Sequence, residues 1–223
     1  MTVVKSKCTV IAAVLIVLGT SANADTVLLN EGFASLAGLA GNGWVLTNNS
    51  TPLGSTGWFQ GDAGIFAAQA GAPESYAAAN FNNAAVGGTI SNWLITPTFS
   101  TATAVAISFW ARADAFAGFA DHLAYGLSAT GSSNTADFTL GALVTVPTTG
   151  WTQYTLSSAA KGAGTFARFA VNYSGSADVS NYLGIDTLSV TSVAAVVPEP
   201  STWLMLGLGL LGLTAVRRRR PLR

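Results

Sequence analysis

Cysteine is almost absent from this chain of 223 residues, which contains only Cys8. Cys8 lies within an N-terminal segment, residues 1–24, that has the pattern of a secretory signal peptide and that we expect signal peptidase to remove. The mature chain then begins at Asp25 and contains no cysteine. This excludes disulfide bonds, a catalytic thiol and a zinc site with cysteine ligands from the mature protein.

Three features carry the signal-peptide prediction. Lys5 and Lys7 give the segment a positively charged start, and the apolar run Thr9–Leu18 follows. Ala22 and Ala24 then supply the small-x-small pattern that signal peptidase cleaves. The protein is therefore expected to be exported.

Basic residues are scarce between the two ends of the chain. From Asp25 to Val197 there are three basic residues against nine acidic ones, which gives a net charge of −6. Nucleic acids attract proteins through clustered lysine and arginine side chains. The three cations, Arg112, Lys161 and Arg168, are scattered, which argues against nucleic acid as a partner.

Histidine occurs once, at His122, and no Gly-x-Ser-x-Gly sequence supplies a nucleophile for it. We expect this histidine to lie on the surface at the start of a strand. Asp114 and Asp121 flank a flexible run, in which nothing fixes the separation of about 5 to 9 Å that paired carboxylates need for glycoside hydrolysis. The chain is predicted not to be an enzyme, and an exported hydrolase is the least favoured function.

Segments with a helical period are also lacking between the two ends. The region is rich in small and polar residues, and no segment combines strong helix formers with an apolar residue every 3.6 positions. Several segments alternate with period two, so that Val105, Ile107 and Phe109 share one face. We predict an all-β domain over residues 25–193. The predicted strands are Val27–Phe33, Gly43–Thr47, Gly57–Gly61, Tyr76–Asn80, Asn92–Thr96, Ala104–Arg112, His122–Ser128, Leu140–Val146, Thr152–Leu156, Thr165–Tyr173 and Tyr182–Thr191.

Seven sequence blocks across this domain resemble the successive blocks of the choice-of-anchor J domain. The blocks are Leu29–Phe33, Ser91–Pro97, Ile107–Arg112, Tyr125–Gly131, Gly150–Leu156, Ala167–Asn172 and Leu183–Val190. That family is similar to the cleaved-adhesin and MAM-like modules. The resemblance implies a jelly-roll β-sandwich, in agreement with the strand pattern.

The C-terminal end of the chain, residues 194–223, contains three elements in a fixed order. They are the motif Pro198, Glu199 and Pro200, the apolar run Trp203–Val216, and the basic cluster Arg217, Arg218, Arg219 and Arg220. This ending resembles the PEP-CTERM sorting signal of Gram-negative bacteria. The resemblance implies that a membrane protease of the exosortase type recognises the segment and removes the tail.

The apolar run is short for a membrane span. A hydrophobic sorting helix over residues 202–216 would be about 22 Å long, whereas the hydrocarbon core is about 30 Å thick. The arginines place its end on the cytoplasmic side, so that the rest of the chain faces outward. A permanent transmembrane tail anchor is the alternative to removal. In both cases we expect the protein in the cell envelope, on the cell surface or in the extracellular matrix of a Gram-negative bacterium.

Glu31 and Asp186 are the strongest candidates for chemistry. A jelly roll commonly places its first and last strands side by side, and in related sandwich modules one carboxylate from each region shares a structural Ca²⁺ with backbone carbonyls. Calcium takes six to eight oxygen ligands. Further ligand candidates are Asn30, Asp62 and Asn80. The alternative is that both carboxylates are polar strand residues paired with Arg112, Arg168 or solvent.

Most aromatic side chains are predicted to pack in the core. These are Trp44, Trp58, Phe59, Phe66, Trp93, Trp110, Trp151 and Tyr154. Phe116 and Phe119 are the exceptions, because two apolar rings in a loop rich in glycine and alanine are expected to be exposed. Exposed rings mark binding sites.

Two classes of function remain open. The first is a non-catalytic surface or matrix protein that contributes to adhesion or to exopolysaccharide and biofilm structure. The second is a carbohydrate-binding, lectin-like module, with or without calcium. An exposed and coplanar pair of rings would favour the lectin, whereas a smooth polar surface would favour the structural role.

Overall fold

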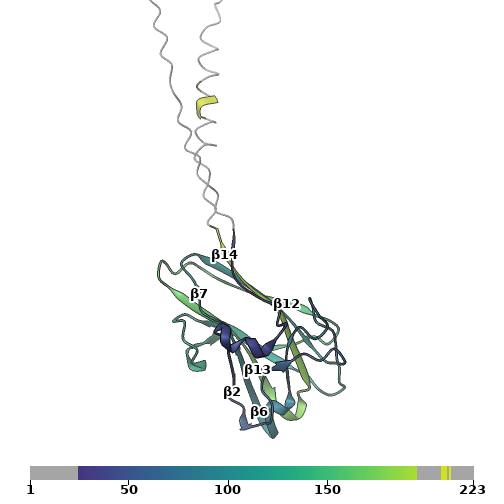
Figure 1. Ribbon diagram of the computed structural model, residues 1–223. Coiled ribbons are helices and arrows are strands. Elements are labelled where there is room, and N and C mark those ends of the chain that lie inside the picture. The colour runs from purple at the N-terminus through teal and green to yellow at the C-terminus, as the bar shows by residue number, and fades with distance from the viewer. Residues whose placement is uncertain (1–24, 195–206, 210, 212–223) are drawn as a thin grey trace, which may run out of the picture. The chain divides into compact units, whose positions relative to one another are not determined.

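The computed structural model of the protein describes residues 25–194, 207–209 and 211 (Figure 1). The predicted cleavage residues Ala22 and Ala24, the motif at 198–200 and the arginines at 217–220 lie outside these described residues. One compact unit covers Ala24–Ala195, and residues 207–209 and 211 of the other unit are helical. Within the described part of the chain, no helix has both the length and the apolar character needed to cross a membrane.

Two antiparallel sheets pack face to face, which confirms the predicted all-β sandwich (Figure 1). Sheet A has the order β12 (Thr152–Ser158), β8 (Ala104–Ala113), β14 (Tyr182–Val193), β5 (Ala77–Asn80) and β4 (Phe59–Gln60), with β1 (Thr26–Glu31) also paired to β14. Sheet B has the order β10 (Thr139–Leu140), β9 (His122–Ser128), β13 (Phe166–Ser176), β6 (Ala84–Ile95) and β2 (Val45–Asn48), with β11 (Val144–Thr145) on β9, β3 (Thr51–Leu53) on β6 and β7 (Phe99–Ser100) on β13. Short 3₁₀ helices occur at η1 (Leu36–Gly38), η2 (Ala40–Asn42), η3 (Phe81–Asn83), η4 (Thr135–Asp137) and η5 (Ala177–Val179).

Alternating side chains fill the space between the sheets. On β8 the predicted inner face, Val105, Ile107 and Phe109, is at most 1% exposed. Phe109 packs on Phe169 of β13 in the opposite sheet, with ring centroids 5.6 Å apart. The period of two in the sequence therefore identifies which face of the strand is buried.

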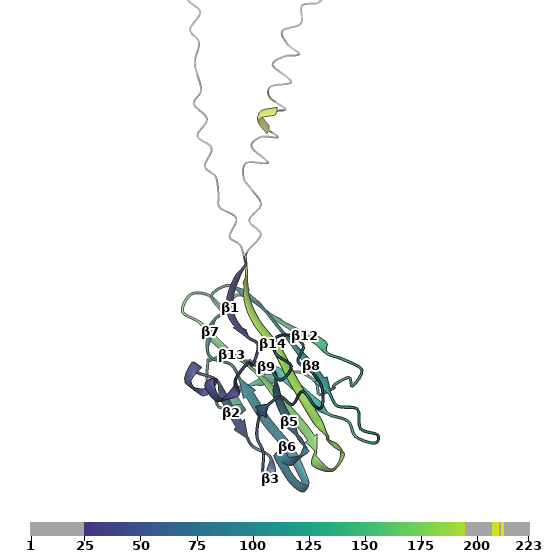
Figure 2. The same ribbon diagram turned by 45° about the vertical axis from the view of Figure 1, so that its right-hand side comes forward.

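The strand β14 runs from one end of the sandwich to the other. It pairs with β5 through Tyr182–Ile185 and with β1 farther along, where Thr26 lies opposite Ser192. The expected neighbouring of the first and last strands is thus confirmed. We call the end with Thr26 and Val193 the proximal end, and the opposite end, where β3 lies, the distal end (Figure 2).

Some predicted strand bounds were wrong. The segment predicted at 92–96 is the end of the longer β6, whose first half was missed because Gly87 and Gly88, which are unfavourable in strands, interrupt it. The segment predicted at 140–146 divides into β10 and β11, because Gly141 leaves the ladder after its amide donates to the Tyr125 carbonyl at 2.9 Å. The strand β3 was missed because it contains Pro52, which is tolerated only on a sheet edge.

Candidate functional site

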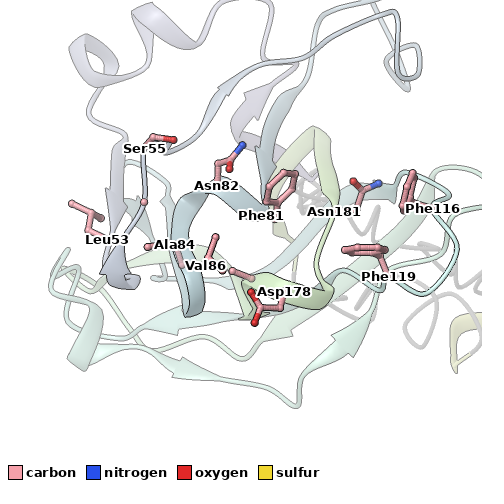
Figure 3. A pocket seen from close by; sticks show the side chains of 13 residues that line it. Leu53, Ser55, Phe81, Asn82, Ala84, Val86, Phe116, Phe119, Asp178 and Asn181 are labelled. Atoms are coloured by element: carbon pink, nitrogen blue, oxygen red, sulfur yellow. The ribbon is translucent and has the colours of Figure 1, made fainter.

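An open groove of about 910 Å³ lies at the distal end of the sandwich (Figure 3). Its apolar side chains are Leu53, Phe81, Val86, Phe116 and Phe119, and its polar side chains are Ser55, Asn82, Asp178 and Asn181. The five apolar side chains are 38% to 96% exposed. A contiguous apolar surface of this kind marks an interaction site in a soluble protein. We call it the distal groove.

Phe116 and Phe119 form one wall of the distal groove (Figure 3). Their rings lie 5.1 Å apart at an angle of 72°. A turn presents them, in which the Phe119 amide donates to the Phe116 carbonyl at 3.1 Å and Gly118 has a φ of 86°. The expected exposure of both rings is confirmed. The rings are not coplanar, however, so they form a corner and not a flat platform.

The buried Asp121 fixes the base of this aromatic loop. Its Oδ1 accepts the Tyr173 hydroxyl at 2.6 Å and the Asn181 amide at 2.9 Å, and its Oδ2 accepts the Tyr182 amide at 3.1 Å. Burial raises the pKa of Asp121, and these hydrogen bonds oppose the rise. One carboxylate therefore ties the loop to β13 and to the start of β14.

Asn181 is held from several sides. Its backbone amide donates to Asp121, its carbonyl accepts the Phe81 amide at 3.0 Å, and its Nδ2 donates to Asp114 Oδ2 at 3.0 Å. The groove thus presents an amide side chain whose position is set by the fold. Such preorganised polar groups beside apolar walls are typical of small-ligand sites.

The opposite side of the groove is built on η3 and the start of β6. Asn80 caps η3 by accepting the Asn82 amide at 3.1 Å, which turns Phe81 and Asn82 toward the groove (Figure 3). Asp178 Oδ1 accepts the Gly87 amide at 2.8 Å and holds the part of β6 that carries Val86, where the pairing with β3 shifts register. Sequence reasoning missed this side. The available signal was an isolated phenylalanine among asparagines at 80–83.

Asp114 and Asp121, which were not expected to act as a catalytic pair, form hydrogen bonds within this fold. Asp121 is 1% exposed and accepts three hydrogen bonds, while Asp114 accepts the Asn181 side chain. His122 is the first residue of β9, as expected, and is half-buried. Asp114 and Asp121 therefore do not form a pair of solvent-accessible carboxylates at the loop over residues 115–120.

Asp186 lies where β5 ends and β1 begins along β14. Its Oδ2 accepts the amides of Gln69 at 2.8 Å and Ala70 at 3.0 Å, and its Oδ1 accepts the Thr187 amide at 2.6 Å. Burial raises the pKa of Asp186, and these amide hydrogen bonds oppose the rise. The carboxylate therefore pins the loop that contains residues 69 and 70.

Glu31 lies nearby, since it pairs with Leu188 and lines a hollow of about 420 Å³ together with Ala70, Ser75 and Thr187. Its Oε1 accepts the Phe33 amide at 2.8 Å. The described residues contain no cluster of three or more His, Cys, Asp or Glu side chains. A calcium ion in this hollow would need backbone or hydroxyl oxygens as well, and the calcium site stays a prediction.

The arginines suggested as alternative partners are engaged elsewhere. The Arg112 guanidinium lies 4.6 Å from the centre of the Phe66 ring. Arg168 donates to the carbonyl oxygens of Gly131, Gly43 and Thr96 at 2.7 to 3.0 Å. Both arginines therefore stabilise loops.

Comparisons with known proteins agree with both parts of the chain. Residues 196–220 match the PEP-CTERM protein-sorting motif. The K3 cleaved adhesin domain of Lys-gingipain from Porphyromonas gingivalis is similar in structure, with a TM-score of 0.58 and 19% identity over 76% of this chain and 100% of that domain. The K1 domain of the same protein has a TM-score of 0.57 and 18% identity over 77% of this chain and 99% of that domain.

The K2 cleaved adhesin domain of Lys-gingipain is similar as well, with a TM-score of 0.51 and 21% identity over 76% of this chain and 99% of that domain. No curated protein matches the sequence. At these identities the structural likeness defines the fold. The chain therefore combines a PEP-CTERM sorting motif, typical of exported proteins handled by an exosortase-type system, with a β-sandwich of the cleaved-adhesin type.

Proposed function

We propose that the protein is a non-catalytic, surface-displayed adhesion module that binds an extracellular polysaccharide in its distal groove. One observation carries the proposal. The exposed aromatic groove lies at the distal end of the sandwich, whereas the chain leaves the domain toward the sorting motif at the proximal end. The groove is therefore presented away from the point of attachment.

The length of β14 sets the distance between these two ends. Asn181, in the groove, directly precedes β14, and Val193 ends it after 12 residues. At about 3.3 Å per residue the strand spans roughly 35 Å. A ligand in the groove is thus held about one domain length from the C-terminal exit.

The chemistry of the groove favours a saccharide. A sugar ring has apolar C–H faces and a rim of hydroxyl groups, and the groove offers phenyl rings beside the amides of Asn82 and Asn181. Because Phe116 and Phe119 are tilted by 72°, one ring is available to stack on a sugar face while the other borders its edge. This geometry suits a single sugar unit or a chain end better than a long flat segment.

Calcium has a structural role in this proposal. The groove and the hollow beside Glu31 share no lining residue in the described part of the chain. An ion at Glu31 and Asp186 would therefore tie β1 to β14 without touching the sugar.

Binding of the full-length protein to immobilised polysaccharides tests this function. The panel includes the exopolysaccharide of cells that display the protein. We expect Phe116→Ala and Phe119→Ala each to weaken retention at least about tenfold, as for truncation of a central aromatic anchor. Phe166→Ala is the matched control, since Phe166 is 52% exposed on β13 but outside the groove. Equal retention of all three variants would contradict the proposal.

We also propose that the mature form spans Asp25 to the sorting motif, that residues 25–193 fold as one domain, and that the cells are Gram-negative. The intact mass of protein recovered from the cell surface tests the processing. We expect a chain that begins at Asp25 and lacks the arginines at 217–220. Surface protein that retains these arginines would instead indicate a permanent tail anchor.

A further inference from the structure

A second cavity opens along one side of the sandwich, where the edge strand β12 of sheet A faces β9, β10 and β11 of sheet B. Its volume is about 590 Å³. The walls carry Tyr125, Leu127, Leu140, Val144 and Leu156. We call this cavity the lateral slot. In contrast to the distal groove, it is lined mainly by inner-face side chains, namely Tyr125, Leu127, Val144 and Leu156, whereas Leu140 packs with Trp93 on the outer face of sheet B.

Small residues keep the lateral slot open. Ala129, Gly141, Ala142 and Ala167 line it, and their side chains fill little of its volume. The break between β10 and β11 falls at residues 141–143, directly at the opening. The slot is therefore an accessible extension of the hydrophobic core.

One cation lies at this slot. Of the three basic residues in 25–194, Arg112 covers Phe66 and Arg168 is bonded to three carbonyl groups. Lys161 lines the slot, and its side chain is exposed. An exposed cation of an acidic domain thus borders a largely apolar cavity.

The backbone around Lys161 is fixed against the slot. The Lys161 amide donates to the carbonyl of Thr101, which also lines the slot, at 2.9 Å. The Thr101 hydroxyl donates to Thr165 Oγ1 at 2.9 Å, and the Thr165 hydroxyl donates to the Gly162 carbonyl at 2.7 Å. The lysine is thus held beside the cavity by its own loop.

We propose that the lateral slot binds a long-chain fatty acid, with the acyl chain between the sheets and the carboxylate at Lys161. Each methylene of an acyl chain that leaves water for this cavity favours binding. A saccharide would find hydroxyl partners at Thr101, Thr139 and Ser158 but would leave its other hydroxyl groups against leucine and valine side chains. In a domain with a net charge of −6, Lys161 is the place where an anion is attracted.

The charged end of the slot lies at the proximal end of the sandwich. Ser158 lines the slot and pairs with Val105, and Val105 pairs with Ser192, next to the last residue of β14. A single-chain amphiphile from a membrane would thus reach the slot from the end where the chain leaves the domain. The protein's own apolar run Trp203–Val216 is a poorer occupant, because neither the run nor residues 217–223 after it contain an acidic side chain to pair with Lys161.

Photo-crosslinking of the full-length protein in phosphatidylcholine vesicles tests this proposal. The probe is palmitic acid with a diazirine in the middle of its chain, and the matched probe is the corresponding alcohol. We expect crosslinks of the acid, mapped by mass spectrometry, within residues 125–127, 140–144 and 156, and we expect excess palmitate to suppress them.

Four variants give the decisive comparison. Leu156→Trp and Ala142→Trp narrow the slot and are expected to lower labelling at least about tenfold, whereas Leu143→Trp, next to the slot but outside its lining, leaves labelling unchanged. Ala142 is exposed, so its replacement keeps the test valid if Leu156→Trp fails to fold. Lys161→Gln is expected to lower labelling by the acid about two- to fivefold and not by the alcohol.

Labelling of Leu143→Trp and Ala142→Trp to the same extent would overturn the proposal. So would crosslinks confined to the distal groove or to residues 203–216, which would identify another site or the protein's own tail as the apolar occupant. Equal labelling by acid and alcohol in the wild type, unaffected by Lys161→Gln, would overturn the role of the lysine.

Discussion

Two loops of similar composition differ in whether their phenylalanine rings are buried. The loop over residues 63–72 and the loop over residues 115–120 are both rich in glycine and alanine and both carry phenylalanine. Phe66 of the first loop is 5% exposed, whereas Phe116 of the second is 59% exposed. Composition alone therefore does not decide whether an aromatic ring in such a loop is buried.

The two loops differ in the contacts that their aromatic rings make with the rest of the domain. Phe66 stacks on Tyr76 with centroids 5.1 Å apart, and Trp151 donates its indole N–H to the Ala67 carbonyl at 2.9 Å. Gly184 of β14 makes room for this cluster, since a Cβ there would lie 2.9 Å from the Phe66 ring. Among the aromatic ring pairs of the described residues, Phe116 and Phe119 pair only with each other. A loop with docked rings serves stability, and a loop with free rings is available for binding.

The largest effect that tests this contrast is expected for Phe66→Ala. Truncation of a buried phenylalanine typically lowers the free energy of unfolding by about 3–5 kcal/mol. The loss of its contacts with Tyr76 and Arg112 gives the reason here. Chemical denaturation of the purified protein measures it. A change below about 1 kcal/mol would show that the loop over residues 63–72 is not docked in solution.

The second test concerns the calcium site predicted at Glu31 and Asp186, beside the docked loop. If Glu31 and Asp186 bind calcium, the ion stabilises the fold by about 2.7 kcal/mol at a hundredfold excess over Kd, and EDTA should lower the melting temperature accordingly. Glu31→Gln keeps the oxygen that accepts the Phe33 amide but removes the charge. We expect it to abolish the effect of EDTA while the chelated protein melts as the wild type does. Identical melting with and without EDTA would refute the calcium site.

The third test concerns the carboxylate that pins the aromatic loop. In Asp121→Asn the side-chain amide meets the Tyr182 amide as donor against donor, so one hydrogen bond is lost. We expect the free energy of unfolding to fall by about 1–3 kcal/mol. Circular dichroism during denaturation measures this loss, and an unchanged stability would show that the Tyr182 contact is dispensable.

The raised pKa of Asp121 predicts how the stability of the protein depends on pH. Because burial raises its pKa in the folded state, the folded protein binds this proton more tightly than the unfolded chain. The stabilisation that comes from this proton is therefore fully present below pH 3.8, the ordinary pKa of the carboxyl group, and is lost as pH rises through the raised pKa of the folded state. The wild type should accordingly lose stability relative to Asp121→Asn as pH rises through this range. An advantage that grows with pH would contradict the raised pKa.

Much of this fold was predictable because strand periodicity is a local property. The alternation around Phe109 identified β8 and its buried face, and the pairing of the first and last strands followed from the jelly-roll resemblance. The split of the 140–146 segment was not predictable, because it depends on the contact of Gly141 with Tyr125 across the sheet.

The candidate site was predictable only in part, for the same reason. Phe116 and Phe119 are close in sequence, and their exposure was predicted from the loop of glycine and alanine residues in which they lie. The opposite wall, with Phe81 and Val86, comes from η3 and the start of β6, which tertiary structure brings to the distal end. Asp121 had no local signal either, since its partners Tyr173 and Tyr182 lie more than 50 residues away.

The smallest effect on stability is expected for Phe116→Ala and Phe119→Ala. Both rings are substantially exposed, so their truncation should change the free energy of unfolding by no more than about 0.5 kcal/mol. The same two variants are expected to lose polysaccharide retention at least about tenfold. Denaturation and binding measured on one preparation separate the two effects. A large loss of stability would mean that the rings are docked as Phe66 is, and the contrast between the two loops would then fail.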